Sequence, residues 1–141
     1  MTAVSTHVLD TVRGEPAAGV VVRLERVWAA AGRGAGCGSG VGSGASAGPG
    51  PAAAGEPGQS YELGRGTTDA DGRISDFGVA VLPAGTYRLV FATGPYLSAE
   101  HPGGAAFFPE VVVTFAADGR RPRYHVPLLL SPYSYSTYRG S

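Results

Sequence analysis

The sequence predicts an all-β fold, an eight-stranded β-sandwich with one short helix. Short runs of alternating apolar and polar residues are separated by turn residues, and no long segment has the 3.6-residue period of an amphipathic helix. Two Asp-Gly pairs, at residues 71–72 and 118–119, mark tight turns between such runs. Short strands joined in antiparallel hairpins bury their apolar faces by packing two sheets together, which favours a sandwich.

The first two predicted strands are residues 5–10 and 19–27, joined by a turn over residues 13–16. On the first strand His7 and Leu9 share one face, because successive side chains of a strand point to opposite sides. The second strand has a clear alternation with Arg and Glu on its wetter side. Its core face is predicted to consist of Val20, Val22 and Leu24.

The composition changes abruptly over residues 29–58. Eleven of these thirty residues are glycine and nine are alanine. Such a stretch cannot bury enough apolar surface to offset its ordering entropy, so it is predicted to be a flexible loop. Each doubling of loop length costs only about 0.6 kcal/mol, which a domain tolerates. The chain is therefore predicted as a single domain, 1–141, with this segment as a neutral insertion or, alternatively, a functional lid or linker.

The second half of the chain carries the other six predicted strands and the helix. The helix is expected over residues 96–101, where Pro102 and the glycines after it would end it. Residues 76–83 have no pattern that assigns them. The strand over 86–93 should turn Tyr87, Leu89 and Phe91 to one face. The six strands are expected at residues 60–68, 73–74, 86–93, 108–115, 124–131 and 133–139.

The charge balance and composition exclude several classes of function. Eleven acidic residues balance eleven basic ones, so a broad attraction to nucleic acid or to anionic lipid is not expected. Every basic residue is arginine, which removes lysine-based covalent catalysis. The single cysteine, Cys37, rules out an internal disulfide and a cysteine zinc cage. No apolar run is long enough to span a bilayer and no signal peptide is recognisable, so a soluble, cytoplasmic protein is predicted.

The candidate catalytic and ligand-binding residues in the body of the chain are histidines and arginines. His7 and His125 lie on predicted strands, where a histidine is more often structural than catalytic, and His101 lies in a Pro/Gly loop. Their spacing matches no metal motif, so no metal site is expected. Arg73 directly follows a turn and is either a solvated side chain or a fixed cation for an oxygen-rich ligand. The arginines at 120, 121 and 123 are expected to form a solvated turn.

The last residues of the sequence are unusually aromatic. Tyr133, Tyr135 and Tyr138 offer flat rings that could stack on a heterocycle or pack at an interface. Arg139 and Ser141 add polar groups beside them. From the residues alone, a site and an interface remain alternatives for this segment.

Five stretches together resemble the 5-hydroxyisourate hydrolases, the enzyme branch of the transthyretin-like family. They are THVLDTVRGEPAAGV, TTDADGRI, GTYRLVF, FFPEVVVTF and YHVPLLLSPYSYSTYRGS. The closing Tyr-Arg-Gly-Ser, the histidine of YHVPLLLS and the arginine of DGR are marks of the enzymes that separate them from the hormone-carrying transthyretins. The segment 29–58 departs from the usual family pattern.

The resemblance implies a transthyretin-like sandwich that pairs edge to edge into dimers and then into a homotetramer, with the substrate in a channel between dimers. The implied reaction is hydrolysis of the lactam bond of 5-hydroxyisourate to 2-oxo-4-hydroxy-4-carboxy-5-ureidoimidazoline, in the degradation of urate. No cofactor is implied. The alternative is a non-enzymatic carrier of an aromatic ligand in the same channel.

The resemblance also assigns site residues. The catalytic residues it implies are His7, Arg73, His125 and Ser141, and the substrate-binding residues are His7, Arg73, Tyr138, Arg139 and Gly140. One of the two histidines would deprotonate water while the other protonates the leaving nitrogen, since imidazole titrates near neutral pH. Arg73 would stabilise the oxyanion, Tyr138 would hold the substrate, and Ser141 would order the water or a histidine. Which histidine is the base stays open.

Overall fold

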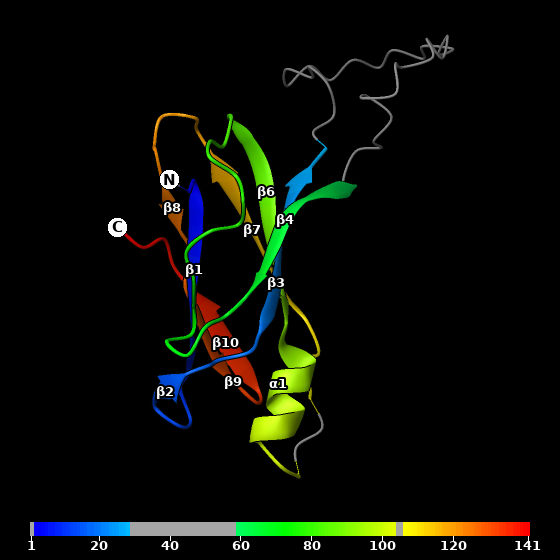
Figure 1. Cartoon of the computed structure of the whole chain (residues 1–141). Coiled ribbons are helices and arrows are strands. Elements are labelled where there is room, and N and C mark those ends of the chain that lie inside the picture. The colour runs from blue at the N-terminus through cyan, green and yellow to red at the C-terminus, as the bar shows by residue number, and fades with distance from the viewer. Residues whose placement is uncertain (1, 29–58, 104–105) are drawn as a thin grey trace, which may run out of the picture.

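Two β-sheets lie face to face, and a short helix packs at one end of them (Figure 1). The structure is a computed structural model and describes residues 2–28, 59–103 and 106–141. The predicted all-β sandwich with one short helix is confirmed. Within the described residues, no helix is long and apolar enough to cross a membrane.

The first sheet is organised around β1 (Val4–Asp10), which has paired strands on both edges. Along one edge it pairs antiparallel with β5 and β2, and along the other it pairs parallel with β8 and β9. β10 then pairs with β9 and forms the edge of the sheet. The bounds are β2 (Glu15–Pro16), β5 (Arg73–Ile74), β8 (Tyr124–His125), β9 (Leu128–Ser131) and β10 (Ser134–Thr137).

The second sheet is antiparallel throughout, in the order β4-β3-β6-β7. Its strands are β3 (Val21–Val27), β4 (Ser60–Thr67), β6 (Gly85–Ala92) and β7 (Val111–Ala117). The expectation of antiparallel pairing therefore holds for this sheet, and in the first sheet it fails only where β1 pairs in parallel with β8 and β9. There β1 pairs with strands more than a hundred residues later in the chain, and a connection that long can return the chain in the same direction.

The core lies between the two sheets and follows the period-2 pattern of their strands. Val4, Thr6, Val8 and Asp10 of β1 are buried, whereas Ser5, His7 and Leu9 between them are only half-buried. The predicted core faces of β3 and β6 are confirmed. The fully buried residues of these faces are Val22, Leu24, Tyr87, Leu89 and Phe91, and Val20, just before β3, is fully buried as well. Each such side chain contributes about 1.5–3 kcal/mol by leaving water, so burial fixes which face of β1 points outward.

Prolines account for two of the differences from the predicted elements. The single strand predicted over 124–131 is divided into β8 and β9, because Pro127 has no N–H for the ladder. β7 begins at Val111 instead of residue 108, just beyond Pro109. The predicted turn at 13–16 contains the two-residue strand β2. The helix, α1 (Thr93–Glu100), begins three residues earlier than predicted and follows β6 directly.

The predicted flexible loop at 29–58, with Cys37, lies outside the described residues. The chain on its two sides is held together: the Trp28 N–H donates to the Gln59 carbonyl at 2.7 Å, and Val27 pairs with Ser60. The insertion thus joins the adjacent ends of β3 and β4 in the second sheet.

Candidate active site

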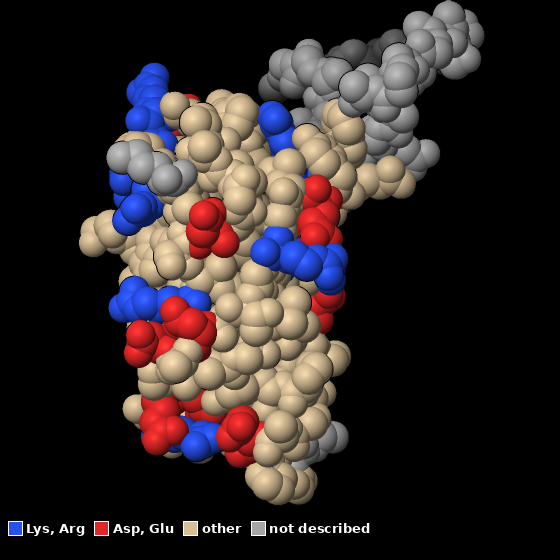
Figure 2. All heavy atoms as spheres, in the orientation of Figure 1, with Lys and Arg blue, Asp and Glu red and all other residues tan. Residues whose placement is uncertain are grey.

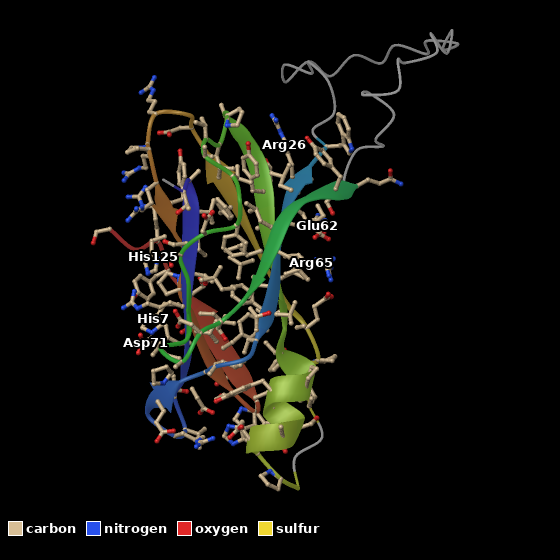
Figure 3. The ribbon with its side chains drawn as sticks, in the orientation of Figure 1. His7, Arg26, Glu62, Arg65, Asp71 and His125 are labelled. Carbon is tan, nitrogen blue, oxygen red and sulfur yellow. The ribbon has the colours of Figure 1, made fainter. Side chains whose placement is uncertain are left out.

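The outer face of β1 brings three of the predicted site residues together. Ser5 and His7 point to this face, since the residues on either side of each are buried. Ser5 pairs with His125 of β8 on one edge, and His7 pairs with Arg73 of β5 on the other. Neighbouring strands lie about 5 Å apart, so these four side chains form a compact group. Figure 3 shows His7 and His125 on the side of the β1 sheet that faces away from the second sheet.

A cavity of about 280 Å³ opens at this group. It is lined by Ser5, Thr6, Arg73, Ile74, Ser75, Arg123, His125 and Ser141. Three of the four predicted catalytic residues, Arg73, His125 and Ser141, are in this lining. His7 does not line the cavity, but it is close enough to His125 to influence its ionisation.

His125 is held mainly as a neutral base. Burial lowers the pKa of His125 below its ordinary value of 6.5, and electrostatic interactions with Arg73, His7 and Arg123 lower it further. A hydrogen bond with the Ser5 backbone opposes these effects in part. The Ser5 hydroxyl lies 2.8 Å from Nδ1 of the ring. A histidine with a depressed pKa in a polar cavity can accept a proton from water at neutral pH.

Gly140 packs directly against the His125 ring. Its N–H donates to the His125 carbonyl at 2.8 Å, which makes an isolated antiparallel bridge between the two residues. A Cβ at Gly140 would lie only 2.4 Å from Cδ2 of the ring. Gly140 thus contacts a predicted catalytic side chain. There is no room here for a side chain, which is a steric reason for glycine at the third position of the closing Tyr-Arg-Gly-Ser tetrapeptide.

The turn before β5 fixes the position of Arg73. The Asp69 carboxylate accepts the N–H groups of Asp71 at 2.9 Å and of Arg73 at 3.0 Å. Gly72 has φ of +72°, and a Cβ there would lie 2.4 Å from the Val8 carbonyl oxygen. Only glycine permits this close approach to β1, so the DGR motif places Arg73 beside His7.

Two residues that line the cavity and act on His125 were not predicted as site residues, Arg123 and Ser5. The arginines at 120, 121 and 123 were expected to form a solvated turn, yet Arg123 lines the cavity and lowers the pKa of His125. Ser5 was assigned no role. Its position two residues before His7, on the same face of β1, was the available signal. Figure 2 shows positive side chains along the side of the molecule that carries β8 and the turn before it.

The arginines of this region lack acidic partners. Among the described residues, the ion pairs involve Arg13, Arg23, Arg65 and His101, and none involves Arg73, Arg123 or Arg139. Guanidinium groups without a carboxylate partner are available to bind an oxygen-rich or anionic ligand.

The structure does not bring every predicted residue into one cavity. Tyr138 and Arg139 line a second cavity of about 220 Å³, beside β7, together with Tyr124 and Val126. Ser141 therefore lines the first cavity and Gly140 contacts the His125 ring beside it, while the two residues before them lie at the other cavity.

His101 has a structural place far from both cavities. Its Nε2 lies 2.7 Å from Oδ2 of Asp10, a carboxylate that is only 1 % exposed. Tyr96 of α1 donates to the same oxygen at 2.9 Å. His101 and Asp10 are not part of a larger acidic or histidine group, because the described residues contain no cluster of three or more possible metal ligands.

Comparison with known proteins places the chain in a family. The family model described as HIUase/Transthyretin family matches residues 4–140. The chain belongs to this family. The match includes the strands that carry His7, Arg73 and His125, and it extends to Gly140.

Curated relatives of the family match nearly the whole chain. The 5-hydroxyisourate hydrolase of Caulobacter vibrioides is 37 % identical over 143 residues, covering 100 % of both chains. The uric acid degradation bifunctional protein TTL of Arabidopsis thaliana is 41 % identical over 143 residues. That match covers 98 % of this chain, which spans only 37 % of the length of the bifunctional protein.

Solved structures of the family have the same sandwich. The 5-hydroxyisourate hydrolase of Klebsiella pneumoniae matches with a TM-score of 0.68 and 31 % identity over 100 % of both chains. The transthyretin of Sparus aurata matches with a TM-score of 0.72 and 26 % identity, covering 99 % of this chain and 97 % of that one. The fold is thus shared by both branches of the family and does not by itself separate them.

Proposed function

We propose that this protein is a 5-hydroxyisourate hydrolase that opens the lactam ring to give 2-oxo-4-hydroxy-4-carboxy-5-ureidoimidazoline in urate degradation. The observation that carries the proposal is a histidine with a lowered pKa, His125, in a cavity that also contains two arginines without acidic partners. Relatives at 36–37 % identity over nearly the whole chain are named for this activity. Histidine, arginine and a polar cavity are what hydrolysis of a cyclic amide requires.

In the proposed reaction, His125 acts as the general base. It accepts a proton as the oxygen of water attacks the lactam carbonyl carbon. The carbon–nitrogen bond then breaks, the nitrogen takes up a proton, and the carbonyl becomes a carboxylate. Because His125 is largely neutral at neutral pH, it is ready to accept this proton. A positioned base contributes about 10²–10⁴-fold to such a step.

His7 and Arg73 are the proposed acid and electrostatic groups. They are Cα partners on β1 and β5, beside the His125 cavity. We propose that His7 protonates the leaving nitrogen and that the Arg73 guanidinium stabilises the oxyanion formed at the carbonyl. Ser141, in the cavity lining, is proposed to order the attacking water. Tyr138, Arg139 and Gly140 remain proposed substrate-binding residues; for Gly140, the contact with the His125 ring favours an indirect role.

The proposed assembly is a homotetramer. β10 and β7 are edge strands of their sheets, and unpaired strand edges are templates for pairing with another chain. Aromatic side chains lie beside these edges: Phe108 and Tyr135 meet edge to face at 5.1 Å between ring centroids, and Phe107 and Tyr133 are 65 % and 69 % exposed. Exposed aromatic residues of this kind are enriched at protein interfaces. A cytoplasmic location and the lack of a cofactor stay predictions.

A carrier of an aromatic ligand is the alternative within the same family. The hydrolase is favoured because His125 and His7 lie together with Arg73, whereas a carrier needs no titrating group beside unpaired cations. The names of the curated relatives support the same choice.

The deciding experiment follows the decay of freshly generated 5-hydroxyisourate by ultraviolet absorbance, with and without micromolar protein. We expect decay well above the spontaneous rate, and loss of at least about 100-fold in kcat/KM for His125→Ala. A decay rate equal to the spontaneous background, together with stoichiometric binding of an aromatic ligand, would favour the carrier instead.

A further inference from the structure

A general base needs one ring nitrogen free to accept a proton, and a neutral histidine can have its proton on either nitrogen. If Nε2 carries the proton, the lone pair lies on Nδ1, which in His125 faces the Ser5 hydroxyl at 2.8 Å. If Nδ1 carries it, Nε2 is left free to act on water. The partner of Nδ1 therefore decides whether His125 can act as a base on a water in the cavity.

Ser5 is held firmly enough to be that partner. It lies on β1, which is paired on both edges, and its Cα is in register with that of His125. The Val126 N–H donates to the Ser5 carbonyl at 3.0 Å, so the backbones of the two residues are fixed beside each other. The neighbouring hydroxyl of Thr6 points inward and donates to the Val126 carbonyl at 2.6 Å. Among the described residues, Ser5 is the side chain that hydrogen-bonds to the His125 ring.

The ring is confined on its other side by Gly140. The separation there leaves no room even for a methyl group, since a Cβ would lie 2.4 Å from Cδ2. A ring held between Ser5 and Gly140 has little freedom to rotate and to exchange the positions of its two nitrogens. Its orientation is thus set by residues of β1 and of the C-terminal tetrapeptide together.

We propose that Ser5 is a positioning residue, which accepts the Nδ1–H of His125 and so keeps Nε2 as the basic nitrogen. The proposal rests on the proposed hydrolase function and answers which nitrogen of His125 acts as the base. Ser5 does not itself react with substrate. Its hydroxyl selects the tautomer, in the way that the partner of the second nitrogen commonly does for catalytic and metal-binding histidines.

The groups around the His125 ring favour a hydrogen bond in which Nδ1–H donates to the Ser5 hydroxyl. A hydrogen bond with the Ser5 backbone favours the protonated ring. The charged and titrating groups that face His125 are Arg73 from β5, His7 from β1 and Arg123 from the segment before β8. Arg73 and Arg123 cannot replace Ser5 as the acceptor, because a guanidinium group has donors only.

The first test is nuclear magnetic resonance of the imidazole nitrogens in the full chain at neutral pH, without substrate. The chain has only three histidines, and His125→Gln identifies the signals of His125 by their loss. We expect a protonated Nδ1 and an unprotonated Nε2 in the wild type. A wild-type His125 with the proton on Nε2 would overturn the proposal, whatever the activity of the protein.

The second test compares three variants for both tautomer and kinetics. Ser5→Ala should give a mixture of tautomers and lower kcat by between about 10-fold and 10⁴-fold, the range for losing the group that orients a histidine, with little change in KM. Ser5→Thr keeps the hydroxyl and should restore both. Ser60→Ala is the control, since the Ser60 hydroxyl bonds to Glu25 in the second sheet.

The outcomes separate the two proposals. Unchanged tautomer and kcat in Ser5→Ala would show that Ser5 has no positioning role, even if the protein is a hydrolase. A wild type that has the expected tautomer but does not hydrolyse 5-hydroxyisourate would contradict the proposed function while leaving the role of Ser5 intact. If Ser5→Ala does not fold, the wild-type spectrum and Ser5→Thr still decide.

Discussion

At the scale of single residues, the site depends on the balance of charge around His125. Burial, the guanidinium groups of Arg73 and Arg123, and the nearby His7 all favour its neutral form. The same cations that would bind an oxygen-rich substrate therefore also keep the base unprotonated. Substrate recognition and base strength are linked through one set of side chains.

The pH dependence of the reaction should report this balance. A lowered pKa means that His125 keeps its basic form to more acidic pH than a free histidine does. We expect kcat/KM to stay level near neutral pH and to fall on acidification with a midpoint below 6.5. Arg73→Gln should move that midpoint upward. Initial rates between about pH 5 and 8, corrected for spontaneous decay, measure it, and a midpoint above 6.5 would contradict the assignment of His125 as the base.

Gly140 is predicted to be intolerant of any side chain. In Gly140→Ala the new methyl group would meet the His125 ring at 2.4 Å, so the ring or the tetrapeptide must move. Displacing a catalytic group by about 1 Å costs on the order of 100-fold in rate. We expect that loss in kcat, while the melting temperature changes little, because Gly140 is only half-buried and the other three residues of the tetrapeptide are exposed. Gly119→Ala, at a turn beside Ala84, is a comparison in which the backbone strain arises far from His125.

Arg123 is predicted to bind substrate or product. Arg123→Gln should raise KM by about three- to tenfold, which corresponds to the loss of one hydrogen bond of about 0.6–1.4 kcal/mol at a solvent-exposed position. It should also weaken the dependence of KM on salt. Arg120→Gln is the matched control, because Arg120 is three residues away in the same turn and is absent from the cavity lining. Equal effects of both substitutions would mean that only the general positive charge of the turn matters.

At the scale of elements, the helix α1 is joined to the end of β1 by polar contacts. The carboxylate of the buried Asp10 binds Tyr96 and His101, and it also accepts the N–H groups of Val12 and Arg13 at 3.0 Å. Burial alone would raise the pKa of Asp10, but these hydrogen bonds outweigh burial and lower it. The guanidinium of Arg13 adds an ion pair with Glu100 at the end of the helix.

Breaking this connection should destabilise the protein without affecting catalysis. His101→Ala is expected to lower the free energy of unfolding by about 1–3 kcal/mol, because it leaves the buried carboxylate one partner short. Activity should persist, since Asp10 lies five residues beyond Ser5 on β1, about 16 Å along the strand. Urea unfolding at pH 7, together with the ultraviolet assay, measures both. Loss of activity in a variant that remains folded would contradict the structural role.

The contribution of the Asp10 carboxylate to the stability of the fold depends on pH. The folded pKa of Asp10 is lower than its ordinary value of 3.8, so its contribution to stability is complete above that value. It is lost as the pH falls through the folded pKa, when the carboxylate becomes protonated. His101→Ala should therefore differ least from the wild type in the most acidic conditions.

At the scale of the whole molecule, the free strand edges predict the assembly. Tyr135→Glu on β10 should lower the mass in solution from four times 14.3 kDa to a smaller species, because it places a charge within the proposed interface. Tyr61→Glu on β4 is the matched control: the two side chains are 41 % and 39 % exposed, and only Tyr135 lies on an edge proposed to pair. Light scattering after size-exclusion chromatography distinguishes the outcomes, and an unchanged mass for Tyr135→Glu would argue against pairing through β10.

The period of the apolar residues was sufficient to predict the sandwich and its core faces. It could not predict which strands pair, because the same pattern is compatible with parallel and antiparallel neighbours. The structure brings Arg73 and His125, which come from separate motifs, to one cavity. Ser5 was missed although it shares a face with His7, because only the register of β1 with β8 shows that it meets the His125 ring. Arg123 was missed because it lies in a turn, where no pattern in the sequence shows which way a side chain points.

The central place of β1 has a consequence for the synthesis of the protein. Ser5 and His125 are 120 positions apart in the chain, yet they lie on neighbouring strands. The edge of β1 that pairs with β8 and β9 therefore stays unpaired while the ribosome synthesises the whole second sheet and α1. Contacts of such long sequence separation slow folding and leave a strand edge open to other chains. A nascent chain stalled before β8 should therefore be prone to aggregate. The catalytic group can form only when β8, which carries His125, has been synthesised and has paired with β1.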